Sequence, residues 1–173
     1  MTRNSFFQSF SLSFRKYGKW FLAICWFIGM LFGIGAGRNA SDFLIPTMRS
    51  AAVATVSIPG LLVASALPFL LSAYAVSISE PWLLLIISAY KAFGFSFCAF
   101  AVSLTFGQSG WLVRFLFLFS DHCLIPVLYL YWLRHISGER TFSFWEAVAV
   151  TAVAVLIGCI DYYLISPFLA TLI

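Results

Sequence analysis

Five ionisable residues lie within long apolar stretches of the chain, namely Lys91, Arg114, Asp121, His122 and Asp161. Charged side chains are costly in hydrocarbon, so such residues usually face the interior of a helix bundle and pair with one another. Arg114 and Asp121 are seven residues apart, which places them on one helix face at a separation of two turns. Asp121 then pairs with Lys91, with Arg114 or with neither. The sequence leaves two interpretations, a set of structural ion pairs or a polar pathway for an ion or a substrate.

The neighbours Asp121 and His122 have the residue types of a proton relay or a metal site. No second histidine lies in an apolar stretch, and the four cysteines form no C-x-x-C pair. We interpret the cysteines as small packing residues. The motifs G-x-S-x-G, H-E-x-x-H and G-K-[ST] are also missing. We expect no catalytic residue, no metal and no cofactor, and we do not expect an enzyme.

The elements that carry these residues must be surrounded by lipid. Of the 173 residues, 62% are hydrophobic and 9% are charged, and the mean hydropathy is +1.00. Soluble domains carry about 25% charged residues, so the apolar surplus must face a bilayer. The basic residues are few and scattered, and without a basic stripe we expect no nucleic-acid partner. The composition predicts a single all-α transmembrane helix bundle over residues 1–173.

Five segments are long and apolar enough for membrane spans of about 20 residues, at 20–36, 57–77, 82–106, 111–132 and 142–165. Residues 1–19 form a basic lead-in, expected in the cytoplasm and partly as an amphipathic interfacial helix. The apolar run that follows is longer than the core of a signal peptide, so we expect it to be retained. A further short helix is expected over 44–56.

Prolines mark the expected irregularities of these spans. Proline lacks the backbone N–H, and inside a helix it removes a hydrogen bond and introduces a kink. Helix breaks are therefore expected at Pro59, Pro68 and Pro126, and Ser166-Pro167 is expected to end the last span.

The distribution of basic residues predicts the orientation. With five spans, the N-terminus and the loops at 78–81 and 134–140 share one side of the membrane. That side carries six basic residues: Arg3, Arg15, Lys16, Lys19, Arg134 and Arg140. The opposite side carries two, Arg38 and Arg49. Because short cytoplasmic loops are enriched in Lys and Arg, we expect the N-terminus in the cytoplasm and the C-terminus outside.

A glycine stripe, Gly29, Gly33 and Gly37, follows one face of the first span. Spacing of four places these residues above one another, and the nearly flat face lets a second helix approach closely. The stripe indicates either packing within the bundle or a docking surface for another membrane protein. A homo-oligomer is left open.

Several short motifs resemble one family. They are the basic lead-in RKYGKW (15–20) with the glycine-rich FIGMLFGIGAG (27–37), the block YKAFGFSFCAFAV (90–102), Gly107 to Gly110 with a span ending in Ile125-Pro126, and the ending IDYYLISP (160–167). In order and type they resemble the stage II sporulation protein M family of bacterial membrane proteins. Where members of that family often have Asn near the end of the fourth span, this chain has Asp121-His122. The resemblance implies a multi-pass protein of the bacterial cytoplasmic membrane. It also implies a non-enzymatic scaffold that works with cell-wall hydrolases during sporulation.

The sequence supports two functions, of which we favour the first and keep the second as the alternative. The first is a scaffold that docks and positions other membrane proteins, motivated by the glycine stripe, the short loops and the resemblance. The second is a small transporter or substrate-binding membrane subunit. It is motivated by the prolines Pro59 and Pro68 in one span and by the embedded charges, since broken helices and midplane charges are features of transporter sites.

Overall fold

The computed structural model describes residues 3–43, 58–78, 80, 82–107, 111–136 and 143–172, and this part of the chain is helical with short connections. Its helices are α1 (Arg3–Asn39), α3 (Ile58–Ser77), α4 (Trp82–Phe106), α5 (Trp111–Phe117), α6 (Phe119–His135) and α7 (Phe144–Ile160). A π-helical turn η2 (Asp161–Ile165) and the short α8 (Ser166–Leu172) continue α7. The expected helix at 44–56 lies outside the described residues.

Three stretches of helix in the described part are long and apolar enough to cross a membrane: Lys16–Asn39, Trp82–Phe106 and Phe144–Leu169. The bent pair of α5 and α6 makes a fourth if the two helices are counted as one span. For the described residues, the expectation of an all-α protein with apolar helices long enough to cross a membrane is confirmed.

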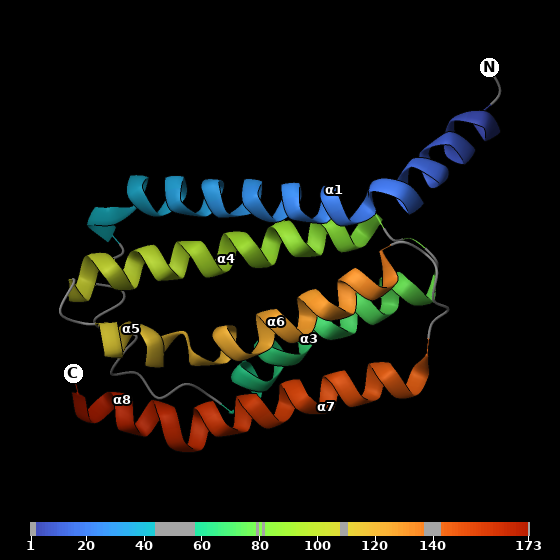
Figure 1. Cartoon of the computed structure of the whole chain (residues 1–173). Helices are drawn as coiled ribbons and strands as arrows, with labels where there is room; N and C mark the ends of the chain where they lie inside the picture. The colour runs from blue at the N-terminus through green and yellow to red at the C-terminus, as the bar shows by residue number, and fades with distance from the viewer. Residues whose placement is uncertain are drawn as a thin grey trace.

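The helices lie side by side along one long axis (Figure 1). Their chain directions alternate from α1 to α3, α4, the α5–α6 pair and α7. α1 and α4 therefore run in the same direction. α1 occupies one edge of the bundle, and its N-terminal part diverges from the other helices (Figure 1).

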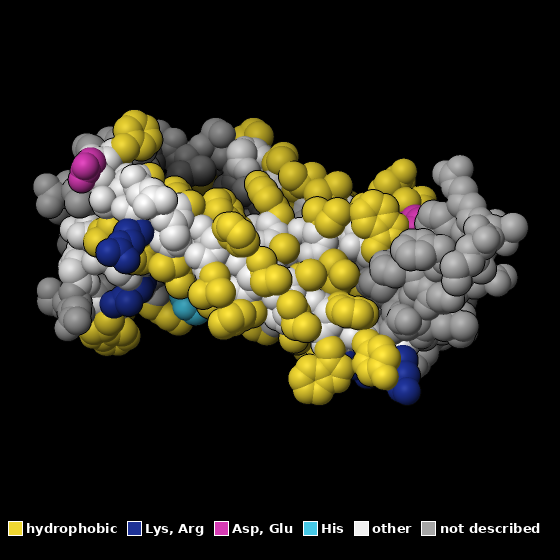
Figure 2. Space-filling view, turned by 90° about the horizontal axis from the view of Figure 1, so that it is seen from above, with side chains coloured by type: hydrophobic (Ala, Val, Ile, Leu, Met, Phe, Trp, Pro, Cys, Tyr) yellow, Lys and Arg dark blue, Asp and Glu magenta, His cyan; other side chains and the backbone are white. Residues whose placement is uncertain are grey.

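Small and polar residues share the interior with a core of large apolar side chains. Ser72, Ser88 and Ala92 are completely buried, whereas Phe32 is 70% exposed and Trp145 is 77% exposed. Close backbone contacts through small residues are typical of helix packing in membranes, where lipid offers large apolar side chains an equally apolar environment. Figure 2 shows the consequence on one face, where apolar side chains cover the middle and charged side chains lie toward the ends. This distribution matches a molecule surrounded by hydrocarbon.

The proline expectations need correction. Pro59 lies in the first turn of α3, where the missing N–H has no intrahelical acceptor to lose. α3 and α6 continue as helices through Pro68 and Pro126. Membrane helices tolerate internal prolines when nearby groups satisfy the freed backbone atoms. None of the three prolines divides a helix.

The last helix does not end at Ser166-Pro167 either, because α8 carries it on to Leu172. The Ser166 N–H donates to the carbonyl of Asp161, five residues earlier, in the π-helical turn. We attribute this wide turn to Pro167, whose ring would press on the carbonyl four residues before it in a regular α-helix. The chain thus passes the proline by widening one turn.

Candidate functional site

The fourth helical rod is broken at Leu118, between α5 and α6. The two helices meet at a bend of 56°, and Leu118 has φ −104° and ψ 16°, outside the helical region. The imidazole Nδ1 of His122 lies 2.7 Å from the Leu118 carbonyl oxygen. A side chain from the next turn thus contacts the backbone at the break, and Ser120 and Asp121 follow directly in the first turn of α6.

Lys91 and Asp121 form an ion pair between α4 and α6. The Lys91 Nζ lies 2.5 Å from Asp121 Oδ1, and the two side chains are 17% and 22% exposed. A lone charge at the bilayer centre costs about 2.5–3.5 kcal/mol on insertion scales, and the opposite charge offsets part of that cost. The structure therefore places Asp121 against Lys91, one of the partners that the sequence left open.

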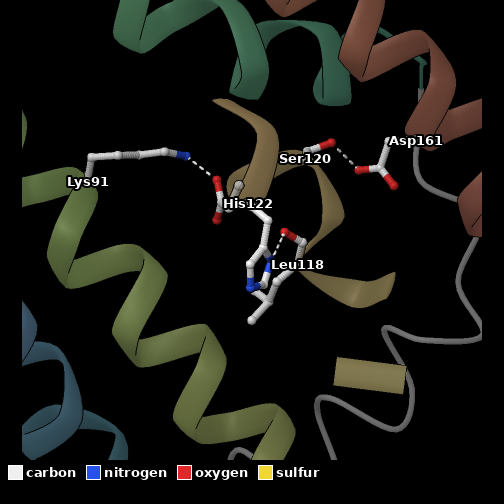
Figure 3. Close-up of polar contacts among 6 residues, drawn as sticks. Lys91, Leu118, Ser120, His122 and Asp161 are labelled. Carbon is white, nitrogen blue, oxygen red and sulfur yellow. Dashed lines mark hydrogen bonds and ion pairs between the residues drawn. The ribbon is translucent and has the colours of Figure 1, made fainter. Parts of the chain in front are cut away.

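Asp161 lies on the other side of α6 from Lys91. It is the first residue of η2 and is 9% exposed, and the Ser120 hydroxyl donates a hydrogen bond to its Oδ2 (Figure 3). Neighbouring residues of one helix, Ser120 and Asp121, thus contact opposite helices (Figure 3). We call the four residues Lys91, Ser120, Asp121 and Asp161 the polar layer.

The polar layer lies well inside the bundle. Asp161 is 17 residues beyond Phe144 and 11 residues before Leu172. At a rise of about 1.5 Å per residue, these intervals correspond to about 25 Å and 17 Å. The layer also coincides with two irregularities of the described helices, the break at Leu118 and the π-helical turn. π-Helical turns and broken membrane helices occur frequently at functional sites.

Arg114 does not join the polar layer. It belongs to α5, and the bend at Leu118 separates it from Asp121 on α6, so the two residues do not lie on one continuous helix as expected. Among the described residues Arg114 has no carboxylate within ion-pair distance. His122 contacts the rings of Phe95 and Phe115 at centroid distances of 5.6 and 5.2 Å. His122 therefore lies at the break and takes no part in the ion pair between Lys91 and Asp121.

The glycine stripe faces α4. A Cβ atom added to Gly29 would lie 3.0 Å from the Cα of Ala89, and one added to Gly37 would lie 2.9 Å from the Phe100 ring. At Gly33 it would collide with the Phe93 carbonyl oxygen and the Ser96 hydroxyl. Of the two interpretations of the stripe, these contacts support packing within the bundle. The glycine face is therefore occupied by the chain's own α4.

A second polar cluster, at the junction of α6 and α7, was missed in the sequence. Glu146 lies 3.2 Å from the Arg134 guanidinium and 3.6 Å from Nε2 of His135. His135 is 3% exposed, and neither ring nitrogen has a hydrogen-bond partner in the described structure. The sequence places Arg134 and His135 in the polar loop 134–140, whereas the structure includes both residues in the last turn of α6. The sequence carries no periodic signal that His135 turns inward.

The polar layer can bind or pass a small charged species, because it combines an amine, two carboxyls and a hydroxyl on three neighbouring helical segments. Within the described part of the chain, no three His, Cys, Asp or Glu residues are grouped as metal ligands. No protein-family model, curated protein or solved structure matches the chain. The resemblance to the sporulation family therefore stays an expectation based on its motifs, and the site must be interpreted from its own geometry.

Proposed function

We propose that the chain is a five-span membrane protein with its N-terminus in the cytoplasm and its C-terminus outside. The alternating helix directions support this topology (Figure 1). α3 has 20 residues, and at about 1.5 Å per residue it is about 30 Å long, close to the thickness of the hydrocarbon core. Reporter fusions after residue 173 should behave as extracytoplasmic. A cytoplasmic reporter at that position would overturn the five-span topology.

We further propose that the protein is a small transporter or substrate-binding membrane subunit whose polar layer handles a small charged species. The observation that carries this function is the position of the Lys91–Asp121 pair at the break between α5 and α6. A purely structural ion pair needs no interrupted helix. An interrupted helix supplies a joint that can move, and broken helices are a feature of transporter sites.

Flux in proteoliposomes tests this function. The purified protein is reconstituted around a pH-sensitive dye, and an imposed pH gradient is followed in the presence of different small ions. Wild-type protein should collapse the gradient faster than empty liposomes. The double variant Lys91→Met with Asp121→Leu should fold, because neither charge is left alone, but its flux should fall to the background. Equal flux from the folded double variant and the wild type would remove the polar layer from the function.

A scaffold that docks other membrane proteins is the second candidate, and the arrangement of α1 favours it. The glycine stripe fixes one face of α1 to α4, while the opposite face exposes large apolar residues: Trp20, Ile24, Phe27, Ile28, Leu31 and Phe32. A rigid, aromatic edge helix is suited to contact a second membrane protein. Cell-wall hydrolases are the partners that the resemblance implies, and a second copy of the chain is another candidate.

Site-specific photo-crosslinking in cells tests the scaffold. A crosslinker at Phe27 or Phe32 should capture one discrete protein species, which mass spectrometry then identifies. The matched control is Leu156 of α7, which is 60% exposed and also apolar. Capture from α1 but not from α7 supports docking through α1. Lipid adducts alone at all three positions would show that the outer face of α1 is an ordinary lipid contact.

A further inference from the structure

We propose that Asp161 is a proton-binding site, a carboxyl that holds an exchangeable proton inside the bundle. This inference rests on the proposed function, in which the polar layer handles a small charged species, and it identifies that species as a proton. It begins with the charges of the layer, which holds one amine on Lys91 and two carboxyls on Asp121 and Asp161. With all three groups ionised, the layer carries one negative charge without a counter-ion. One added proton makes it neutral.

The geometry assigns that proton to Asp161. The Lys91 Nζ is 2.5 Å from Asp121 Oδ1, so the amine compensates Asp121. Asp161 is 9% exposed and has the neutral Ser120 hydroxyl as its side-chain partner. A buried carboxylate without a cation is far more costly than a buried carboxylic acid. The neutral acid is the form that this environment accepts.

Asp121 is the only charged residue near Asp161 on the described segments that pack against η2. α6 brings Asp121, whose charge is shared with Lys91 on α4, and His122, whose Nδ1 contacts the Leu118 carbonyl oxygen. α7 carries Cys159 and, 15 residues away at its other end, Glu146. α8 has no titratable side chain, and η2 itself adds Tyr162 and Tyr163. Among the described residues, none of these groups forms an ion pair with the Asp161 carboxyl.

Loss of the proton has a defined consequence. When Asp161 releases it, the polar layer gains one uncompensated negative charge. A new proton or another cation must then enter to restore neutrality, because one amine cannot compensate two carboxylates. Since Ser120 and Asp121 are adjacent on α6, a movement at the break would shift the Ser120–Asp161 contact and the Lys91–Asp121 contact together. The proton on Asp161 and the position of the first turn of α6 therefore depend on the same two contacts.

A hydrophobic carbodiimide tests the inference, because it adds to a protonated carboxyl in an apolar environment. The acid O–H adds across a C=N bond, and the product rearranges to a stable N-acylurea without a leaving group. An ordinary aspartate is protonated in only roughly one molecule in a thousand at neutral pH and reacts poorly. In the folded full-length protein at neutral pH, peptide mapping should find the reagent's added mass on Asp161 and not on Asp121.

Two variants sharpen the result. Asp161→Asn should lose the label, and Lys91→Met should gain a second label on Asp121, because a layer without its amine needs a second proton. An Asp161 that resists the reagent when folded and reacts only after denaturation would overturn the inference, as would a label on Asp121 in place of Asp161. The flux assay is read separately. Labelling without flux refutes the transport function and leaves the proton site, whereas flux without labelling refutes the proton site alone.

Discussion

Replacement of Gly33 by alanine should weaken the bundle, whereas the same change at Gly35 should not. A Cβ at Gly33 would lie 3.1 Å from the Phe93 carbonyl carbon and closer still to its oxygen, while a Cβ at Gly35 has nothing within 4 Å. Since the Phe93 carbonyl is backbone, α1 and α4 must separate by about 1 Å to restore ordinary contact distances. Overpacking of this kind costs about 1–3 kcal/mol. Gly35→Ala should stay within about 1 kcal/mol of wild type, on the stabilising side, because alanine favours helix.

Reversible unfolding in mixed micelles measures both free energies of unfolding under one set of conditions. The two glycines are two residues apart on the same helix, so the pair controls for expression, micelle composition and helix propensity. Gly33→Leu should lower the free energy of unfolding further than Gly33→Ala. Equal stability of the Gly33 and Gly35 variants would show that the glycine stripe does not contact α4 as described.

Three other substitutions are measured by the same unfolding assay. Asp121→Ala should lower the free energy of unfolding by about 3–5 kcal/mol because it leaves the Lys91 charge unpaired. Adding Lys91→Met should recover part of this loss, and no recovery would mean that the two charges do not interact. Ser72→Ala removes the acceptor of the 2.8 Å hydrogen bond from the buried Trp132 indole, and should cost about 0.6–1.7 kcal/mol, the range of interhelical hydrogen bonds in membranes. His135→Phe should leave the free energy of unfolding unchanged or raise it, because it removes two buried ring nitrogens without hydrogen-bond partners. A clear loss of stability would instead indicate that the contact with Glu146 holds α6 to α7.

The sequence predicts the helices well because membrane helices are long apolar segments separated by polar ones. The expected segment 82–106 coincides with α4, and the expected 57–77 differs from α3 by one residue at its start. The break at Leu118 could not be predicted, because Phe117, Leu118 and Phe119 read as continuous apolar helix. A bend at such a position depends on tertiary packing. Proline, the usual sequence marker of a break, pointed to the wrong places.

The site was predictable in part. A charge in hydrocarbon must find a partner, so Lys91 and Asp121 were already candidate partners in the sequence. The contact between Ser120 and Asp161 was not found, since serine is common in membrane helices and carries no charge. The inward position of His135 was missed for a similar reason, because it sits at the boundary between an apolar segment and a polar loop. The residue types thus indicate which side chains belong to the site, whereas only the three-dimensional structure shows which residues they contact.

The parallel contact between α1 and α4 has a consequence for the order of synthesis. Gly29 meets Ala89, which is translated 60 residues later, after α3 has turned the chain back across the bundle. During that interval the bare glycine backbone of α1 stands in the translocation machinery or in lipid without the helix that later covers it. A nascent chain halted after Ser77 should therefore be captured by insertion factors through this face, and a chain released after Phe106 should escape them.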